Sequence, residues 1–244
     1  MSVEGVVNLF KPIGASSAQY VYRLRPILNV RRVGHAGALD PFADGVLLAC
    51  VGRATRCVER LMELPKEYDV ELRLGVENAS HDPELPFLPV AGARDPDPRD
   101  VDEALRRYVG WIEQTPPQFS ALKIDGRPAY RLARRGDVQP LASRRVFIER
   151  IDLLGHTWPV MRLRVVCGRG TYIRALARDL GQRWGCGAVC TALRRTRVGP
   201  FGVDASVNLN SAAPEAVHAA LIDVERLMTM LPAPSAPAAA EEGR

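Results

Sequence analysis

The feature that most constrains this chain is a glycine-rich loop that runs directly into an apolar strand. Residues 34–45 hold three glycines, one histidine, two aspartates and one proline. The unbroken apolar run 46–51 that follows predicts a buried strand, so the core fixes one end of the loop. Glycines permit φ > 0 and close approach of a ligand, and Pro41 fixes φ directly after Asp40. The loop therefore presents Asp40 in a set conformation, although Asp-Pro and Asp-Gly pairs are also typical of an ordinary turn.

Periodicity predicts how strands and helices follow one another. Alternation is clearest over residues 66–75, where Tyr68 faces the same side as the apolar residues. Thr171 is the predicted N-cap of a helix, a turn is predicted near Gly155, and residues 77–98 are predicted to form a long surface loop. Predicted strands cover 3–10, 46–51, 66–75, 111–114, 145–154, 160–167 and 190–198, and predicted helices cover 16–28, 54–64, 100–108, 128–135, 171–184, 214–221 and 224–231.

The order of these elements indicates the fold class. The length of 244 residues fits one large domain or two small ones. Strands and helices are interspersed without the strict repetition of βαβ units, and no internal repeat is visible. We therefore predict an α/β (α+β) fold with a mixed, mainly antiparallel sheet flanked by helices and loops.

Basic residues are clustered, although the formal net charge is only +5. Arginine supplies a planar fork for phosphate oxygens, so the clusters predict a nucleic-acid partner. The alternative is an ordinary solvated surface of a protein from an arginine-rich organism. Along the predicted strand 160–167, Arg162 and Arg164 are expected to make one sheet face basic. The clusters lie at Arg23/Arg25, Arg31/Arg32, 131–135, Arg144/Arg145, 162–174 and 194–197.

Several familiar sites are excluded by their missing motifs. The chain contains no G-x-x-x-x-G-K-[ST] loop, G-x-G-x-x-G spacing, H-E-x-x-H or G-x-S-x-G. Its histidines are dispersed and its cysteines scattered, so we expect no metal site. No apolar run approaches the ~20 residues of a membrane-spanning helix, and the first residues lack a signal-peptide pattern. These features predict a cytoplasmic protein with no membrane partner.

The candidates that remain for a functional site are a carboxylate on a loop, an aromatic ring on a strand and an arginine at the start of a helix. Asp40, with an ordinary pKa of ~3.9, is ionised at neutral pH and can act as nucleophile or general base in a dry pocket. An arginine would hold it oriented and ionised, and an aromatic ring could stack on a base turned out of its helix. The helix dipole disfavours Arg174 in a first turn, so we expect an anionic partner beside it; a solvated arginine is the alternative.

From Gly34 to Leu47, the pattern G-H-x-G-x-L-D-P-x-A-x-G-V-L resembles the catalytic motif of the TruB family of pseudouridine synthases. The resemblance covers roughly residues 3–203. It implies a pseudouridine synthase fold and an enzyme that isomerises uridine to pseudouridine, typically U55 in the T-loop of tRNA, by base flipping and attack of an aspartate on the nucleoside. Further blocks match in the same order: Lys11-Pro12-x-Gly14-x-Ser16-Ser17, Lys66-Glu67-Tyr68 with Leu74-Gly75, 114–122, 170–174 with Asp179-Leu180-Gly181, and Leu193-Arg194-Arg195.

The resemblance also implies roles for individual residues. Asp40 corresponds to the catalytic nucleophile, and Arg174 to the arginine paired with it. Tyr68 corresponds to the tyrosine that stacks on the flipped base and helps remove the C5 proton. Leu193 corresponds to a pocket leucine, and His35 to the histidine that helps hold the RNA loop open. The family uses no cofactor and no essential metal. The other predicted RNA contacts are Lys11, Arg31, Arg32, Lys123, Arg169 and Arg194.

Domain boundaries and partners follow from the extent of the resemblance. Residues 1–203 are the expected catalytic domain, 204–231 a short helical extension, and 232–244 a disordered Pro/Ala-rich tail. Many relatives append an RNA-binding PUA module, for which the extension is too short. We therefore expect the catalytic domain to bind the T-arm of tRNA as a monomer without a guide RNA. Residues 76–82 fit the Thr/Ser- and Asp-containing stretch of the family only in part.

Two rival hypotheses stay open. One is a non-catalytic RNA-binding or RNA-folding protein that uses the same basic face, for which strongly salt-dependent binding is expected. The other is an aspartate-dependent hydrolase, which no motif in the chain specifically favours.

Overall fold

The computed structural model describes residues 3–232 except 121, 125 and 138. The predicted disordered tail, apart from residue 232, lies outside the described residues.

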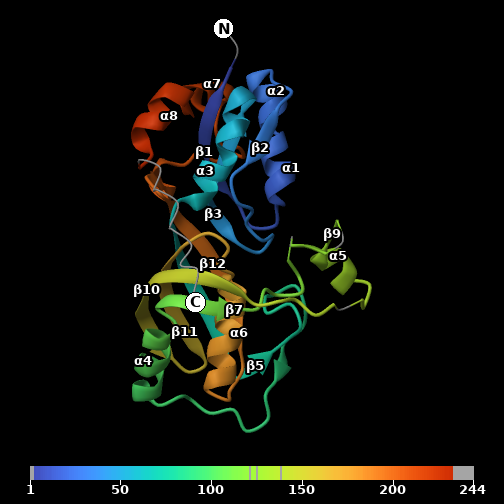
Figure 1. Cartoon of the computed structure of the whole chain (residues 1–244), viewed down its shortest axis with the longest axis vertical. Helices are drawn as coiled ribbons and strands as arrows, with labels where there is room; N and C mark the ends of the chain where they lie inside the picture. The colour runs from blue at the N-terminus through green and yellow to red at the C-terminus, as the bar shows by residue number, and fades with distance from the viewer. Residues whose placement is uncertain (1–2, 121, 125, 138, 233–244) are drawn as a thin grey trace, which may run out of the picture.

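A single mixed sheet runs the length of the molecule (Figure 1). Its strand order is β14-β1-β3-β12-β4-β11-β10-β7, with β2 beside β3 and β13 beside β12. The β3–β12 pair is parallel, whereas the other named pairs along this path are antiparallel. The predicted mixed, mainly antiparallel fold is therefore confirmed. The strands are β1 (Gly5–Lys11), β2 (Val33–His35), β3 (Asp44–Val51), β4 (Lys66–Leu74), β7 (Gly110–Gln114), β10 (Arg144–Thr157), β11 (Val160–Cys167), β12 (Ala188–Val198), β13 (Phe201–Gly202) and β14 (Leu221–Ile222).

Helices and two small ribbons accompany this sheet. The ribbons pair β5 (Val76–Glu77) with β6 (Leu88–Pro89) and β8 (Lys123–Ile124) with β9 (Arg127–Pro128). The helices are α1 (Ser17–Tyr22), α2 (Leu24–Leu28), α3 (Val58–Glu63), α4 (Pro98–Arg107), α5 (Ala129–Ala133), α6 (Ile173–Arg183), α7 (Pro214–Ala219) and α8 (Val224–Met230), with 3-10 helices η1 (Gly52–Cys57) and η2 (Val203–Ala205).

Several predicted element boundaries were wrong, among them the following three. The helix predicted over 16–28 is broken at Arg23 into α1 and α2. The N-cap of α6 is Tyr172 rather than Thr171, and its side chain makes no capping hydrogen bond. Strand β10 continues past Gly155, which pairs with Arg162 of β11; the pairing is irregular between Leu153 and Gly155, where Leu154 is the extra residue.

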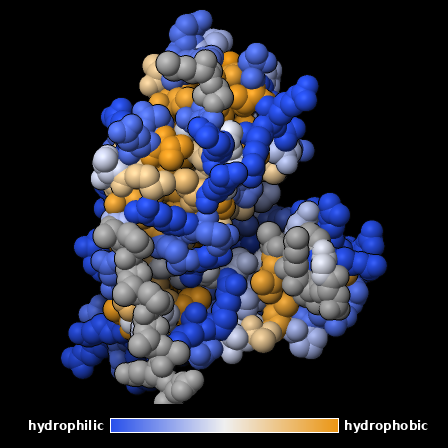
Figure 2. All heavy atoms as spheres, turned by 45° about the horizontal axis from the view of Figure 1, so that its top comes forward, coloured by the Kyte–Doolittle hydropathy of each residue, from blue (hydrophilic) through white to orange (hydrophobic). Residues whose placement is uncertain are grey.

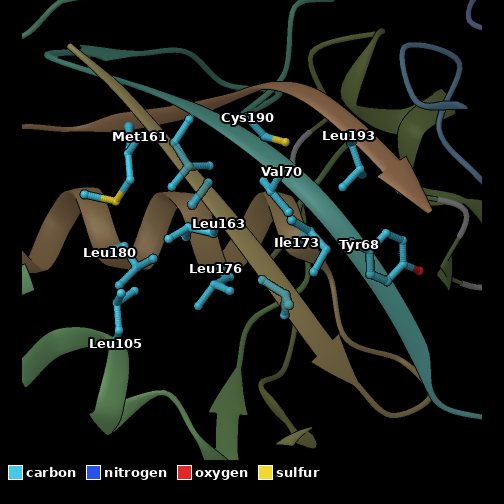
Figure 3. Close-up of a cluster of buried hydrophobic side chains, with 14 of the residues drawn as sticks. Tyr68, Val70, Leu105, Met161, Leu163, Ile173, Leu176, Leu180, Cys190 and Leu193 are labelled. Atoms are coloured by element: carbon cyan, nitrogen blue, oxygen red, sulfur yellow. The ribbon is translucent and has the colours of Figure 1, made fainter. Parts of the chain in front are cut away.

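The lower half of the molecule is built on α6. Its apolar side chains, among them Leu176 and Leu180, pack against Val70 of β4 and Leu163 of β11 in one buried cluster (Figure 3). Tyr68 and Leu193 lie at one end of this cluster. The helical stripe and the strand alternation thus converge on the same interface.

The upper half is built around β3, which is buried along its whole length. Val46 and Leu48 pack into one cluster, whereas Leu47 and Ala49 pack into another on the opposite face. A strand covered on both faces needs an unbroken apolar run, which explains the sequence of β3. Residues 204–231 also pack here, since β14 pairs with β1 and α8 joins the first of these clusters.

The predicted basic face of β11 is neutralised by neighbouring acids. Arg164 binds both carboxylate oxygens of Asp69, at 2.7 and 3.0 Å, and Arg162 lies 3.2 Å from Glu71. The acids come from the alternating polar positions of β4, which pairs with β11. This face is therefore a set of cross-strand ion pairs rather than a free cationic surface.

The two halves meet where β3 and β12 run side by side. Gly45 pairs there with Arg195, and a Cβ on Gly45 would lie 2.3 Å from the Arg195 carbonyl oxygen. The backbone of Gly45 also has φ +106°. Only glycine tolerates both conditions, so this residue of the loop 34–45 sets the junction between the halves.

Candidate active site

Asp40 is fixed from both sides by backbone contacts of its neighbours. The Ser17 hydroxyl, at the start of α1, accepts from Leu39 N at 2.8 Å and donates to Leu39 O at 3.0 Å. Gly14 N donates to Pro41 O at 2.7 Å. The Asp40 side chain is 33% exposed. The loop therefore presents a partly solvent-accessible acid on a pinned backbone, as the sequence predicts.

Arg174 binds this carboxylate with two parallel hydrogen bonds. Nε donates to Oδ2 of Asp40 at 2.8 Å, and one terminal nitrogen donates to Oδ1 at 2.9 Å. The remaining donors reach Phe119 O at 2.7 Å, Ser80 O at 3.0 Å and the Asp82 carboxylate at 3.1 Å. The Arg174 side chain is only 2% exposed. Its anionic partner is thus present, and the alternative of a solvated arginine is excluded.

Opposing effects act on the pKa of Asp40. Burial raises the pKa of Asp40 above its ordinary value, and the Arg174 guanidinium opposes that rise by charge and by hydrogen bonding. The nearby Asp82 charge acts in the same direction as burial. Since Asp40 binds a permanently charged guanidinium through both oxygens, we expect it to be ionised at neutral pH.

A cavity of about 390 Å³ opens beside Asp40. Tyr68 and Leu193 line it from β4 and β12, and Leu122 lines it from the α5 side. Figure 2 shows the α5 lobe standing off the body of the molecule, with a notch between the two. Burial raises the pKa of the Tyr68 phenol, so this ring is neutral at physiological pH. The cavity therefore combines an acid, an aromatic ring and an apolar side chain.

The loop 77–98 supplies residues that the sequence prediction missed. Asp82 and Ser80 are buried and contact Arg174. Asn78 shapes this stretch, because its amide donates to Asp82 O at 2.8 Å and its side-chain oxygen accepts from His81 N at 2.7 Å. No periodicity marks a polar segment of this kind, so its packing against Arg174 was not visible in the sequence.

Arg195 and Lys66 also border the cavity and were not predicted as site residues. Arg195 is 1% exposed and donates to Val46 O at 2.7 Å and to Gly37 O at 3.0 Å. It therefore clamps the loop 34–45 from β12. One signal was available in the sequence, since Arg195 follows Leu193 at the strand period and must share its face.

The predicted RNA contacts lie in different places. His35 is at the end of β2, and its Nδ1 is buried with no partner among the described residues. Burial lowers the pKa of His35, with Arg195 acting in the same direction, so the ring is neutral at physiological pH. Arg31 and Arg32 border a separate hollow of about 510 Å³ beside η1. The RNA contact predicted for Lys123, in β8, stays a prediction.

Arg169 and Arg194 are engaged in ion pairs. Arg169 lines the cavity and pairs with Glu63 at 2.6 Å and Glu59 at 2.8 Å. Arg194 binds both oxygens of Asp44, at 2.8 and 2.7 Å. An RNA phosphate would have to compete with these carboxylates.

The structure contradicts the RNA contact predicted for Lys11. Its side chain is fully buried, and its ammonium donates to Pro12 O and Ala15 O at 2.9 Å each. Burial lowers the pKa of Lys11 to about 8. A lysine in this position supports the segment after β1 and is not available to an RNA phosphate.

Two classes of feature are absent from the part of the chain that the structure describes. No group of three or more histidine, cysteine or acidic side chains is arranged to hold a metal ion. No helix in residues 3–232, with 121, 125 and 138 left aside, has the length and apolarity needed to cross a membrane.

Comparison with known families gives two matches that together span most of the chain. Residues 25–173 match the model described as TruB family pseudouridylate synthase (N terminal domain). Residues 174–231 match the model described as tRNA pseudouridylate synthase B C-terminal domain.

Curated proteins and solved structures give similar results. The tRNA pseudouridine synthase B of Pseudomonas aeruginosa is 44% identical over 89% of this chain and 71% of its own length. That of Bordetella pertussis is 42% identical over 96% of this chain and 97% of its own. A chain from the crystal structure of a Cbf5-Nop10-Gar1 complex is 28% identical with a TM-score of 0.70. The structural match covers 93% of this chain and 62% of that one.

Proposed function

The chain belongs to the TruB family of pseudouridine synthases, and on that premise we propose that it converts U55 in the T-loop of tRNA to pseudouridine with Asp40 as the nucleophile. The observation that carries the proposal is the two-bond pairing of Arg174 with Asp40 at the edge of the cavity. It fixes an ionised carboxylate where a flipped nucleoside would be held.

Tyr68, Leu193 and Arg174 have separate roles in the proposed reaction. Tyr68 stacks on the flipped uracil, and Leu193 packs against it. Because the buried phenol is neutral, Tyr68 acts first as a stacking surface; removal of the C5 proton by this side chain would require its own deprotonation. Arg174 keeps Asp40 oriented and ionised while Asp82 and the carbonyls of Ser80 and Phe119 hold the guanidinium.

The tRNA is bound through its T-arm, without a guide RNA and by a monomer in the cytoplasm. Similarity supports this choice of substrate. The curated relatives are named for tRNA and are 42–44% identical, whereas the chain from the Cbf5-Nop10-Gar1 complex is 28% identical. His35, Arg31, Arg32, Lys123, Arg169 and Arg194 are the proposed RNA contacts.

Asp40→Asn tests the nucleophile. The amide has nearly the same shape but lacks the charge needed for attack, so pseudouridine formation is abolished while tRNA binding survives. Asp69→Asn is the matched control, because Asp69 pairs with Arg164 in the same two-bond geometry on another face of the sheet. Mapping of pseudouridine positions in tRNA incubated with each variant provides the measurement.

The two outcomes separate the rival hypotheses. Retained turnover by Asp40→Asn would refute Asp40 as the nucleophile. An absence of pseudouridine with the wild-type protein, together with strongly salt-dependent tRNA binding, would favour a non-catalytic RNA-binding protein.

A further inference from the structure

One wall of the cavity carries two buried cations that the proposed roles of Asp40, Tyr68 and Arg174 do not involve. Lys66 and Arg195 both line the cavity and are 7% and 1% exposed. Burying a charge is costly unless it is paired, so an unpaired buried cation beside a reactive carboxylate requires an explanation.

The sheet register brings these cations together. Arg195 of β12 lies directly opposite Tyr68 of β4, and Lys66 is two residues before Tyr68 on the same strand. Side chains two residues apart on a strand share one face, so Lys66, Tyr68 and Arg195 form one surface that continues to Leu193. A uracil stacked on Tyr68 would therefore lie beside both cations.

Neither cation makes an ion pair within the described part of the chain, in contrast to Arg164, Arg174 and Arg194. The Lys66 ammonium donates to Met62 O, and the Arg195 guanidinium donates to the carbonyls of Gly37, Ala38 and Val46. Carbonyl oxygens orient a cation without neutralising it. Because both residues line the cavity, unlike the buried Lys11, the two charges are held in place beside any anion that enters it.

We propose that Lys66 and Arg195 form an anion-binding wall that stabilises the negative charge on the uracil ring during isomerisation. This proposal rests on the proposed function. If Asp40 attacks C1′, an O–C1′ bond forms, the C1′–N1 bond breaks and its electron pair stays on N1 of uracil. If Asp40 attacks C6, the C5=C6 electrons move toward O4. The ring becomes anionic in both cases.

The overall reaction needs no additional reactant. The C1′–N1 bond is replaced by a C1′–C5 bond, the C5 hydrogen leaves as a proton, and N1 gains a proton. Atoms and charge balance, and Asp40 is released as a carboxylate. Preorganised cations in a site shielded from water stabilise such a transient anion far better than solvent does.

A phosphate of the RNA backbone is the alternative anion for this wall. A phosphate bound by this wall would be anionic in both the bound state and the transition state, so losing Lys66 would weaken RNA affinity. A ring anion exists only during the reaction, so losing Lys66 would slow the chemical step at saturating RNA.

The titration of Lys66 supplies a second readout. Burial lowers the pKa of Lys66 to about 8, and Arg195 acts in the same direction. The other charged or titratable groups facing it are Cys167 of β11, Glu63 of α3 and Arg169. The reaction rate should therefore fall as pH rises through about 8, where Lys66 loses its proton.

The test compares Lys66→Met and Lys66→Arg with the wild-type protein in single-turnover pseudouridine formation at saturating tRNA. Methionine keeps the volume without the charge, and arginine keeps the charge at every accessible pH. Arg162→Gln is a control for loss of a basic side chain outside the cavity, at an exposed ion pair with Glu71. Thermal melting verifies that each variant is folded.

We expect Lys66→Met to lower the single-turnover rate about a hundredfold, as for the loss of one oxyanion-hole donor, with unchanged tRNA affinity. Lys66→Arg should restore most of the rate and abolish the alkaline fall. A Lys66→Met rate close to wild type, a loss confined to affinity and its salt dependence, or an alkaline fall that persists in Lys66→Arg would each overturn the proposal. If the wild-type protein makes no pseudouridine, it is the proposed function that fails.

Discussion

At the scale of single residues, the site depends on a buried arginine whose donors are all used. A guanidinium has five N–H groups, and those of Arg174 reach Asp40, Asp82 and the carbonyls of Ser80 and Phe119. The side chain of Asp82 is itself only 5% exposed. Arg174 therefore neutralises a buried acid as well as orienting the reactive one, which couples the stability of the protein to its activity.

Arg174→Ala should lower the free energy of unfolding by about 3–5 kcal/mol, because it leaves the buried Asp82 charge without a partner. Arg164→Ala removes an equally well-formed pair, but that pair is more than a third exposed and should contribute less than about 1 kcal/mol. Urea denaturation of both variants at neutral pH measures the difference. Equal losses in the two variants would contradict the assigned burial of the Arg174 network.

At the scale of elements, the approach of β3 to β12 positions the loop 34–45 against the cavity. Gly45 permits that approach, and Arg195 on the facing strand then reaches back to the loop carbonyls. The same pair of residues thus joins the two halves of the sheet and fixes the backbone that carries Asp40. Activity should depend on this crossing even though Gly45 is not among the residues that line the cavity.

Gly45→Ala should destabilise the protein by more than about 4 kcal/mol, since its Cβ would overlap the backbone of Arg195. Gly14→Ala is the matched control. Gly14 also has a positive φ, +86°, but its Cβ would meet no atom within 4 Å. The control should therefore lose only the backbone strain, about 1–2 kcal/mol. Thermal melting of both variants separates the steric cost from the conformational cost, and similar losses would argue against a close strand crossing.

At the scale of the whole molecule, the charge distribution links the site to global stability. Several basic side chains of the sheet are paired with acids, as in Arg164–Asp69, whereas several titratable groups near the cavity are buried. His81 directly precedes one of these groups, Asp82, the acid that binds Arg174. Burial lowers the pKa of His81 to about 4, and Arg178 and Arg174 act in the same direction while Asp82 opposes them.

His81 should make the protein less stable in mild acid. An unfolded histidine has a pKa of about 6.5, so between that pH and about 4 the unfolded chain binds a proton that the folded chain does not. The contribution of neutral His81 to the free energy of unfolding is fully present above pH 6.5. It falls by about 2 kcal/mol when the pH is lowered to 5.

His81→Asn should remove that part of the pH dependence. Asparagine is chosen because His81 has a left-handed backbone, φ +56°, which asparagine tolerates. Urea denaturation at pH 7 and pH 5 gives the comparison. An identical loss of stability in the variant and the wild type would show that His81 is not buried in its neutral form.

The sequence by itself determined the elements and the reactive groups. An unbroken apolar run specified β3, alternation specified β4, and the spacing of apolar residues specified most of α6, because these patterns follow from local backbone geometry. The loop 34–45 identified Asp40, and the ordered motif blocks identified Arg174 as its partner. Each of these features is carried by residue type and spacing along the chain.

Only the tertiary structure decided which charges are paired, which are buried and which meet at the cavity. Asp40 and Arg174 are 134 positions apart, and Asp82, Arg195 and Lys66 join them through strand register and loop packing. The same information shows that Lys11 is buried and that the basic face of β11 is neutralised. The physical reason is that the environment of a charge depends on which strands are neighbours, and local periodicity does not encode that choice.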